Sequence, residues 1–470
     1  MNSNRVVTGL FEGYKFYHTG KSIELEKDHS TFQDHLQDKE IPLSLLRYNY
    51  GKVWDEDYSH IQEENYLSCE RQDQLKYIYE EKKGIRGFDY TKLNIPLTHL
   101  DYSHAVGPIH AGVIEPGHFR FSIRGEIIRH LTIRLGFQKR NILNLCNGKS
   151  VFEISNYLAS STIDTTSANS LAISRAIESK YIGKISQSEE LYRLLLLESE
   201  RVAIYVGDLG GIAGDVGFYP LLGVCSTERG FPLGWMELLT GSRFARFSIQ
   251  PFQSRHNRKT SVKEIFDYVQ KFKPWLKKLS GHVERAIASS TLRERMQNVG
   301  TISSEESWRY GFSGHTARSS TSSIDIRRSD KQYEELAFDF FHIDSKNKML
   351  GDSWARFLLR WNDIQKSVSF ILKATEAIDW NEIQNKWTPY NLSNIKTNSE
   401  TVTFGAAESW RGAVLVAFKW NKSGDIDKIY YRDPSVLNWH ALELAARGML
   451  IGDFPLMNKS MNHSYAGVDL

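Results

Sequence analysis

The chain has few cysteines, and they are isolated from one another. Its 470 residues include only Cys69, Cys146 and Cys225, and no two of them form a CxxC pair. This spacing argues against a disulfide framework and against a thiolate metal site. We therefore expect the protein to work in a reducing compartment.

The sequence also lacks an excess of charge of either sign. It has 59 basic and 56 acidic side chains, which give a formal net charge of +3 at neutral pH. Nucleic-acid binding draws on a strongly basic surface, and this balance does not indicate one. We therefore expect no nucleic-acid partner.

No stretch is apolar enough to predict a membrane span or a signal peptide. The N-terminal segment MNSNRVVTGLFEGYKF lacks the apolar core of a signal sequence. The most apolar segment, Leu194 to Cys225, is too polar to span a membrane. It is interrupted by charged residues at Glu198, Glu200, Arg201, Asp208 and Asp215. We expect a soluble protein that can still dock on a membrane complex.

Common catalytic and binding motifs are missing as well. The sequence contains no GxxxxGK(S/T) nucleotide loop, no GxSxG elbow and no HExxH helix, and no cysteine–histidine spacing typical of zinc. It also contains no internal repeat and no low-complexity tract. Function must therefore be sought in combinations of weaker signals.

Helical periodicity dominates what the sequence does contain. Ser186 followed by Glu189 is typical of a capping box at a helix start, and a last helix is expected over 435–450. Apolar residues recur at helical spacing in four longer stretches, 167–180, 188–218, 261–287 and 352–378. We predict a mainly α chain with α+β appendages, built as a large helix bundle.

Two β-hairpins are expected at the ends of this bundle. Residues alternate on both sides of a turn at Arg124–Glu126, and again on both sides of Ser423–Asp425. Residues 1–102 are rich in charge and aromatic side chains but show weak periodicity, and they predict only a small α+β region.

A glycine-rich stretch lies inside one of the predicted helices. Each glycine in a helix interior costs about 1 kcal/mol relative to alanine. Gly207, Gly210, Gly211 and Gly214 are spaced three or four residues apart, so they share a face of the helix. This spacing favours close packing against another helix over a ligand-binding loop.

The segment GPIHAGVIEPGHFRF, from Gly107 to Phe121, combines two histidines and a glutamate with glycine and proline. With six later motifs, in the same order, it resembles the large subunit of membrane-bound nickel–iron hydrogenases and the 49 kDa quinone-site component of respiratory complex I. The EPGHFR portion is closer to the formate hydrogenlyase branch. The later motifs are LLLESERVAIYVGDLGGIAGDVGF, GFSGHTARSSTSSIDIRRSDKQY, GDSWARFLLRWNDIQKSVSFIL, AESWRG, DPSVLNWHALELAARGMLIGDFPL and NKSMNHSYAGVDL.

The resemblance implies a family fold over residues 103–470. Residues 1–102 would form a separate N-terminal region, for which a reduced complex I C-subunit-like domain is one interpretation. Membership of this family also implies a peripheral protein, held on the inner face of the cell membrane through partner subunits.

In the hydrogenases of this family, two CxxC pairs hold nickel and iron. The matching positions are Thr162, Thr165, Ser464 and Gly467. Hydroxyls are hard, neutral ligands and glycine has no side chain, whereas these metals suit soft thiolates. We therefore expect no nickel–iron centre and no metal site in this chain, and we expect Thr162, Thr165 and Ser464 to line an inherited cavity.

The complex I branch suggests a quinone instead. Its loop histidine is matched by His110, but the segment that should carry the partner tyrosine, STIDTTSAN, contains none, and Tyr157 lies too far upstream. The family's helix histidine falls on Tyr205. Quinone is thus the one cofactor that the resemblance leaves open, with part of its expected machinery missing.

Other polar residues of the family remain in place. Glu115 matches a glutamate that gates protons beside the hydrogenase metal, and Arg411 matches an arginine over the metal site. With His110, these are the candidate proton-relay or pocket residues. We expect Glu115 and Arg411 to face one another and to form a charge-assisted hydrogen bond.

A second set of polar residues matches a segment that packs at the same cavity or at a subunit interface. These residues are Arg318, Asp325 and Arg327. We interpret the charge run from Arg327 to Lys331 as a solvated or subunit-facing patch. His118 is expected to begin the first hairpin and to hydrogen-bond locally.

Three hypotheses follow for function. The first is a metal-free, hydrogenase-like subunit of a complex I-related assembly, which couples redox or protonation change to membrane subunits. Its implied partners are an iron–sulfur small subunit and antiporter-like membrane subunits. The second is a quinone-binding subunit of an NADH–quinone oxidoreductase-like complex, and the third is a scaffold subunit without chemistry of its own.

Overall fold

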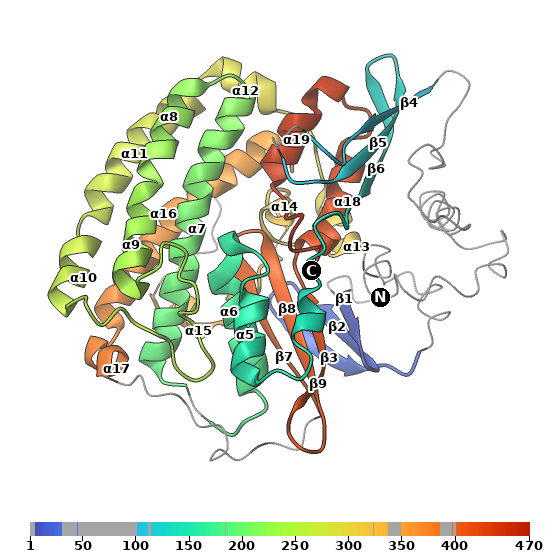
Figure 1. Cartoon of the computed structure of the whole chain (residues 1–470). Helices are drawn as coiled ribbons and strands as arrows, with labels where there is room; N and C mark the ends of the chain where they lie inside the picture. Colours follow the sequence, from blue (N-terminus) through green and yellow to red (C-terminus); the bar gives the residue numbers. More distant parts are fainter. Residues whose placement is uncertain are drawn as a thin grey trace.

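The computed structural model describes residues 5–30, 45, 101–110, 114–183, 185–322, 324–336, 349–385, 397 and 401–470. In this part of the chain, long helices gather on one side and three small antiparallel sheets lie on the other (Figure 1). The predicted architecture, a large helix bundle with hairpins at its ends, is confirmed.

Two long helices form the centre of the bundle. α7 (Gln187–Asp215) packs along α16 (Ser353–Ala377), and most side chains of both are buried. The helices that surround them in Figure 1 are α8 (Tyr219–Glu228), α9 (Gly230–Thr240), α10 (Val262–Val269), α11 (Phe272–Ile287), α12 (Ser290–Met296) and α17 (Trp380–Asn385). None of the helices among the described residues combines the length and hydropathy that a membrane crossing needs.

The remaining helices connect the bundle to the sheets. α6 (Thr166–Glu178) lies between α7 and the C-terminal sheet and contacts both. The others are shorter: α4 (Ile142–Leu145), α5 (Val151–Ala159), α13 (Ser304–Tyr310), α14 (Gly314–Arg318), α15 (Lys331–Leu336), α18 (Ser435–Ala445) and α19 (Phe454–Met461). The predicted helical stretch 261–287 is divided into α10 and α11.

Each sheet has three strands in sequence order. They are β1 (Val6–Phe11), β2 (Tyr14–His18) and β3 (Ile23–Lys27), then β4 (Tyr102–Val106), β5 (His118–Arg124) and β6 (Ile127–Arg134), and finally β7 (Val402–Ser409), β8 (Gly412–Trp420) and β9 (Ile426–Arg432). Both predicted hairpins are confirmed, as β5–β6 and β8–β9. Strands β4 and β7 were not predicted from the sequence.

The first sheet packs on the last. Phe16 of β2 lies in one apolar cluster with Leu415 and Ala417 of β8 and Tyr430 of β9. The predicted boundary at residue 102 falls at the first residue of β4, which pairs with β5. Apart from Leu45, residues 31–100 lie outside the described part, so the division into two regions stays a prediction.

The helix start predicted at Ser186 is present, but only half of the capping box forms. The Ser186 hydroxyl accepts a hydrogen bond from the Glu189 amide at 3.2 Å. The Glu189 carboxylate does not return to Ser186; it accepts instead from Arg193 Nε at 2.7 Å and from Ser254 Oγ at 2.5 Å. These two donors hold the Glu189 carboxylate in the first turn of α7, away from the Ser186 amide.

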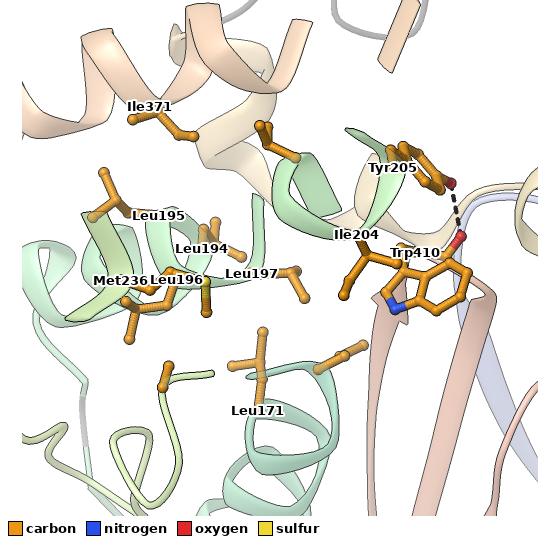
Figure 2. Close-up of a cluster of buried hydrophobic side chains, with 14 of the residues drawn as sticks. Leu171, Leu194, Leu195, Leu196, Leu197, Ile204, Tyr205, Met236, Ile371 and Trp410 are labelled. Atoms are coloured by element: carbon orange, nitrogen blue, oxygen red, sulfur yellow. Dashed lines mark hydrogen bonds between the residues drawn. The ribbon is translucent and has the colours of Figure 1, made fainter. Parts of the chain in front are cut away.

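The glycine face of α7 lets neighbouring helices approach closely, as predicted. A methyl carbon added at Gly210 would lie 2.7 Å from Cβ of Cys225 in α8, and one added at Gly211 would lie 2.5 Å from Cε of Lys459 in α19. Figure 2 shows the other part of α7, where a run of leucines packs on Leu171, Met236 and Ile371. The C-terminal half of α7 thus packs through small residues, and its N-terminal half packs through large apolar ones.

We predict that Gly210→Ala lowers the free energy of unfolding. Overpacking costs about 1–3 kcal/mol, and Cβ of Cys225 cannot move unless α8 moves with it. Gly223→Ala, in α8, is the matched control because an added methyl there meets open space. This control should raise stability by up to about 1 kcal/mol through helix propensity. Urea unfolding of both variants measures the difference, and equal stabilities would contradict the close packing.

Candidate functional site

The first two ligand-matching positions hydrogen-bond to each other. Thr162 caps the short 3-10 helix η3 (Ile163–Thr165), Thr165 ends it, and their hydroxyls are paired. The Asn169 side-chain amide donates to Thr162 Oγ1 at 3.0 Å and to Thr165 Oγ1 at 3.3 Å. Both threonines are buried, and their polar atoms are satisfied by the protein itself.

The other two ligand-matching positions, Ser464 and Gly467, also hydrogen-bond to each other. The Gly467 amide donates to Ser464 Oγ at 2.9 Å, and the Ser464 amide donates to Ser435 Oγ at 2.9 Å. A methyl carbon added at Gly467 would lie 2.6 Å from the carboxylate of Asp433. This buried carboxylate therefore occupies the space that a larger side chain at position 467 would need.

These residues do not fit a nickel–iron centre. Two threonines, a serine and a glycine offer no soft donor, and a cysteine at position 467 would require Asp433 to move. Within the described ranges, no group of three or more histidine, cysteine, aspartate or glutamate side chains is arranged to hold a metal ion.

Arg411 lies in the turn between β7 and β8 and joins the two pairs. Its guanidinium makes a two-pronged contact with Asp164 of η3, at 2.9 and 2.7 Å, and its Nε donates to the carbonyl oxygen of Asn462 at 2.8 Å. The guanidinium also lies 3.9 Å from the centre of the Trp410 ring. Burial by itself would lower the pKa of Arg411, but the carboxylate of Asp164 outweighs it and raises the pKa.

The prediction that Arg411 pairs with Glu115 is wrong: Arg411 does pair with a carboxylate, but with that of another residue. The carboxylate beside the arginine is that of Asp164, whereas Glu115 lies in the exposed segment before β5. Asp164 sits between the two threonines, which brings it directly under the β7–β8 turn. With two carboxylate oxygens and a carbonyl as acceptors, the guanidinium of Arg411 is well satisfied without Glu115.

The described residues on both sides of 111–113 bond to one another, and Gly117 contacts the C-terminal segment. His110 Nε2 lies 2.6 Å from the Gly117 carbonyl oxygen, and His118 Nδ1 lies 3.2 Å from that of Gly107, so His118 bonds locally as predicted. Gly117 packs against the ring of Tyr465: an added methyl would lie 2.6 Å from that ring. The structure thus places a phenol beside the loop that carries His110.

Arg318 and Asp325 are brought together away from Arg411. Arg318 makes a two-pronged contact with Asp363 of α16, at 2.6 and 2.8 Å, and its Nε lies 3.2 Å from Asp325 Oδ2. Asp325 caps the 3-10 helix η4 (Ile326–Ser329) and also accepts from Arg327 Nη2 at 2.6 Å. All four side chains are buried.

Arg327 extends this group into α7. Its Nη1 lies 3.3 Å from Glu198 Oε1, and Arg201 Nε donates to Glu198 Oε2 at 3.1 Å. The interpretation of Arg327–Lys331 as a solvated or subunit-facing patch is wrong for Arg327, which is 1% exposed. We name the buried ionic group the arginine cluster; its members are Arg201, Arg318, Arg327, Glu198, Asp325, Asp363 and Glu408.

Helix α7 connects the arginine cluster to the turn that carries Arg411. Arg201 Nη2 donates to the carbonyl oxygen of Glu408 at 2.7 Å, and Nη1 donates to that of Ser409 at 3.2 Å. The Tyr205 hydroxyl donates to the Trp410 carbonyl oxygen at 2.7 Å, shown as the dashed line in Figure 2. Three successive carbonyls at the end of β7 are therefore held by side chains of one helix.

Glu200, also in α7, binds the start of α6, which follows the threonine pair in the chain. Its carboxylate accepts from the amides of Ser167 at 2.6 Å and Ala168 at 3.4 Å, at the start of α6. Burial raises the pKa of Glu200 to about 8, although these amides act to lower it. Glu200 thus fixes the start of α6, directly after the segment that carries Thr162 and Thr165.

Sequence reasoning missed Asp164 and Tyr465. Both lie inside quoted motifs, but only the fold shows that Asp164 faces Arg411 and that Tyr465 packs on the loop. A usable signal was present for the arginine cluster: Glu198, Glu200 and Arg201 interrupt the most apolar segment of the chain. Charges at buried helix positions require partners, and this requirement predicts a buried ionic group.

Comparison with known proteins shows the family of this chain. A profile described as "Respiratory-chain NADH dehydrogenase, 49 Kd subunit" matches residues 215–470, more than half of the chain. The carbon monoxide-induced hydrogenase of Rhodospirillum rubrum is 22% identical over 364 residues, which cover 77% of this chain and 97% of the relative. An NADH-quinone oxidoreductase subunit of Chloroherpeton thalassium is 24% identical over 381 residues, covering 76% and 84%.

A solved structure shows the same fold. A chain of the membrane-bound sulfane sulfur reductase, described as an archaeal respiratory membrane complex, superposes with a TM-score of 0.66 at 19% identity; the match covers 79% of this chain and 98% of that one. The resemblance to the formate hydrogenlyase branch in particular stays a prediction. On the family match, this chain belongs to the 49 kDa subunit family of the respiratory-chain NADH dehydrogenases.

Proposed function

We propose that this chain is a large-subunit-like component of a membrane-associated, complex I-related assembly, and that it works without a nickel–iron centre of its own. In this role it couples a redox or protonation change in its partners to ion-translocating membrane subunits. Family membership supports the proposal, as do relatives named as NADH-quinone oxidoreductase subunits and a hydrogenase.

One observation carries the metal-free part of the proposal. At the four ligand-matching positions, hydroxyl and amide groups are already paired with one another, and Arg411 with Asp164 bridges the two pairs. Where the hydrogenases of this family use metal–sulfur bonds, this chain uses hydrogen bonds and one ion pair. Such a site can respond to charge and protonation, but it offers no metal for electrons to reach.

The family resemblance implies the partners. Electrons would have to be carried by clusters in an iron–sulfur small subunit. Antiporter-like membrane subunits would receive the conformational or protonation change, and this chain would remain peripheral on the inner face of the membrane.

Metal analysis of the assembled complex tests the metal-free role. The complex, purified through a tag on this chain, should contain iron from its small subunit but no stoichiometric nickel. Elemental analysis by mass spectrometry, normalised to the amount of this chain, gives the ratio. One nickel per chain would contradict the proposal.

The Arg411–Asp164 pair offers a test of the coupling role. Asp164→Asn should lower the free energy of unfolding by about 1–3 kcal/mol, because it leaves a buried guanidinium without its carboxylate. It should also reduce turnover of the assembled complex while the subunits stay associated. Asp427→Asn, at an exposed position of β9, is the control and should leave both unchanged. Full turnover of the assembled Asp164→Asn complex would instead favour a scaffold.

A quinone-reducing role is the second candidate, and the position of Tyr465 favours it. The ring of Tyr465 packs on Gly117, whose carbonyl oxygen lies 2.6 Å from His110 Nε2, so a phenol and an imidazole meet at one residue; the Tyr465 hydroxyl accepts a hydrogen bond from Asn458 Nδ2 at 3.4 Å. The missing tyrosine of the predicted machinery would then be supplied from the C-terminal segment.

For this second candidate, His110→Ala should abolish quinone-dependent turnover of a complex that still assembles. The loss follows from the removal of a proton donor. His104→Ala is the matched control, because His104 is exposed on the neighbouring strand β4. Steady-state assays with a soluble quinone compare the two. Unchanged turnover in His110→Ala would remove the candidate.

A further inference from the structure

The arginine cluster contains one more carboxylate than guanidinium. Three of its acidic residues are ion-paired: Glu198 with Arg201 and Arg327, Asp325 with Arg318 and Arg327, and Asp363 with Arg318. The fourth, Glu408, makes no ion pair with any residue in the described part of the chain. Four carboxylates against three guanidiniums leave one negative charge in excess if all seven groups are ionised.

Glu408 is buried and has few hydrogen-bond partners, so a negative charge on it would be poorly stabilised. The residue is 2% exposed, in the middle of the cluster at the end of β7. Its Oε2 accepts a single long hydrogen bond, from the Ile326 amide at 3.3 Å, and its Oε1 has no hydrogen-bond partner within the described residues. An ionised carboxylate with so few partners carries a large desolvation penalty in the protein interior.

We propose that Glu408 is a proton-binding site, and that one exchangeable proton on its carboxyl group balances the arginine cluster. The proton removes the excess charge and leaves all three arginines with ionised partners. Burial and the negative charge of Asp325 raise the pKa of Glu408 to about 8, against the nearby positive charges of Arg327, Arg201 and Arg318. The proton is thus held near neutral pH but is close to release.

The charged groups around Glu408 come from the elements packed against β7. α7 contributes Glu198 and Arg201, α14 contributes Arg318, α16 contributes Asp363, and the η4 segment contributes Asp325, Arg327 and the partly exposed Arg328. In α6, Arg175 is paired with Glu190 and Asp330, and in β9 the buried Arg432 donates to the carbonyl oxygen of Ala413, the residue opposite Glu408. Near Asp325, burial lowers the pKa of His18 to about 3, so this imidazole is neutral. Its Nδ1 accepts the Gly20 amide at 2.8 Å, which agrees with an unprotonated nitrogen. Arg328 can be satisfied by solvent, so it does not have to be balanced inside the cluster.

Loss of the proton would affect Arg411. An ionised Glu408 would attract Arg201 and Arg327, which now bind Glu198 and Asp325. Arg201 also holds the carbonyls of Glu408 and Ser409, three and two residues before Arg411. The protonation state of one buried carboxyl is therefore linked to the turn that positions the Arg411–Asp164 pair. A role of this link in coupling rests on the proposed function, whereas the protonation of Glu408 is independent of it.

Infrared spectroscopy of the purified full-length chain tests the proton directly. At neutral pH the wild-type protein should show the carbonyl stretch of a protonated carboxylic acid, shifted in heavy water, and Glu408→Gln should lose part of this band. Asp427→Asn, at an exposed position of β9 outside the cluster, is the control. It should leave the band unchanged, because it alters neither Glu408 nor the charge balance of the cluster.

Stability against pH provides the second measurement. An unfolded glutamate titrates near about pH 4.3, so between that pH and about pH 8 the native protein binds one proton more than the unfolded chain. Wild-type stability should therefore fall relative to Glu408→Gln as pH rises through this window. The thermal midpoint of Glu408→Gln should exceed that of the wild type near pH 8, and the two should converge near pH 4.5.

A Glu408→Gln variant that is less stable than the wild type near pH 8, that fails to fold, or that keeps the full carboxylic acid band would overturn the proposal. The amide is close in shape to the protonated acid, so it should be tolerated wherever the acid is. Turnover of the assembled complex separates the two proposals. If Glu408→Gln loses part of the infrared band but turnover is unchanged, the protonation of Glu408 is supported and its role in coupling is contradicted.

Discussion

The buried guanidinium of Arg201 is the contact on which the rest of the site depends. It lies in the middle of the long helix α7, where it pairs with Glu198 and donates to the carbonyls of Glu408 and Ser409. A charge at such a position is tolerated only if every partner is in place. Helix α7, the end of β7 and the η4 segment must therefore meet around Arg201 and its partner Glu198.

The candidate site follows from that meeting point. Because the end of β7 is fixed by α7, the next residues form a defined turn, and Arg411 in this turn reaches both η3 and the C-terminal segment. Those two segments carry Thr162, Thr165, Ser464 and Gly467, the positions predicted from the family resemblance to match the metal ligands of the hydrogenases. In this chain they are joined by an arginine and an aspartate, and a carboxylate fills the space beside Gly467.

Much of the fold could be predicted from the sequence because long amphipathic helices and tight hairpins have local signals. The glycine face of α7 is one example, since its spacing alone predicted close helix packing. β4 was missed because it pairs with β5 across the segment between Val106 and His118, and β7 was missed because its two-residue turn to β8, Trp410–Arg411, lacks the Asn-Gly or Asp-Gly pair typical of such turns. The packing of the first sheet on the last is also non-local, since Phe16 meets Tyr430 from the other end of the chain.

The candidate residues show the same limit. Family resemblance located Thr162, Thr165, Ser464 and Arg411, but it could not show which carboxylate Arg411 would meet. The run from Arg327 to Lys331 looks like a solvated patch in sequence, and only the fold shows Arg327 enclosed by Asp325 and Glu198. The burial of Arg327 is set by distant segments, so its own run of charges does not reveal it, whereas Glu198 and Arg201 are marked by the apolar stretch that they interrupt.

The most direct test of this account is amide hydrogen exchange in an Arg201→Lys variant. A lysine keeps the positive charge but cannot reach Glu198 and two carbonyls at once. The account predicts faster exchange in the β7–β8 turn and in the segment around Thr162–Thr166, with protection of α10 and α11 unchanged. Exchange that stays as slow as in the wild type at both segments, or that rises equally across the whole chain, would contradict it.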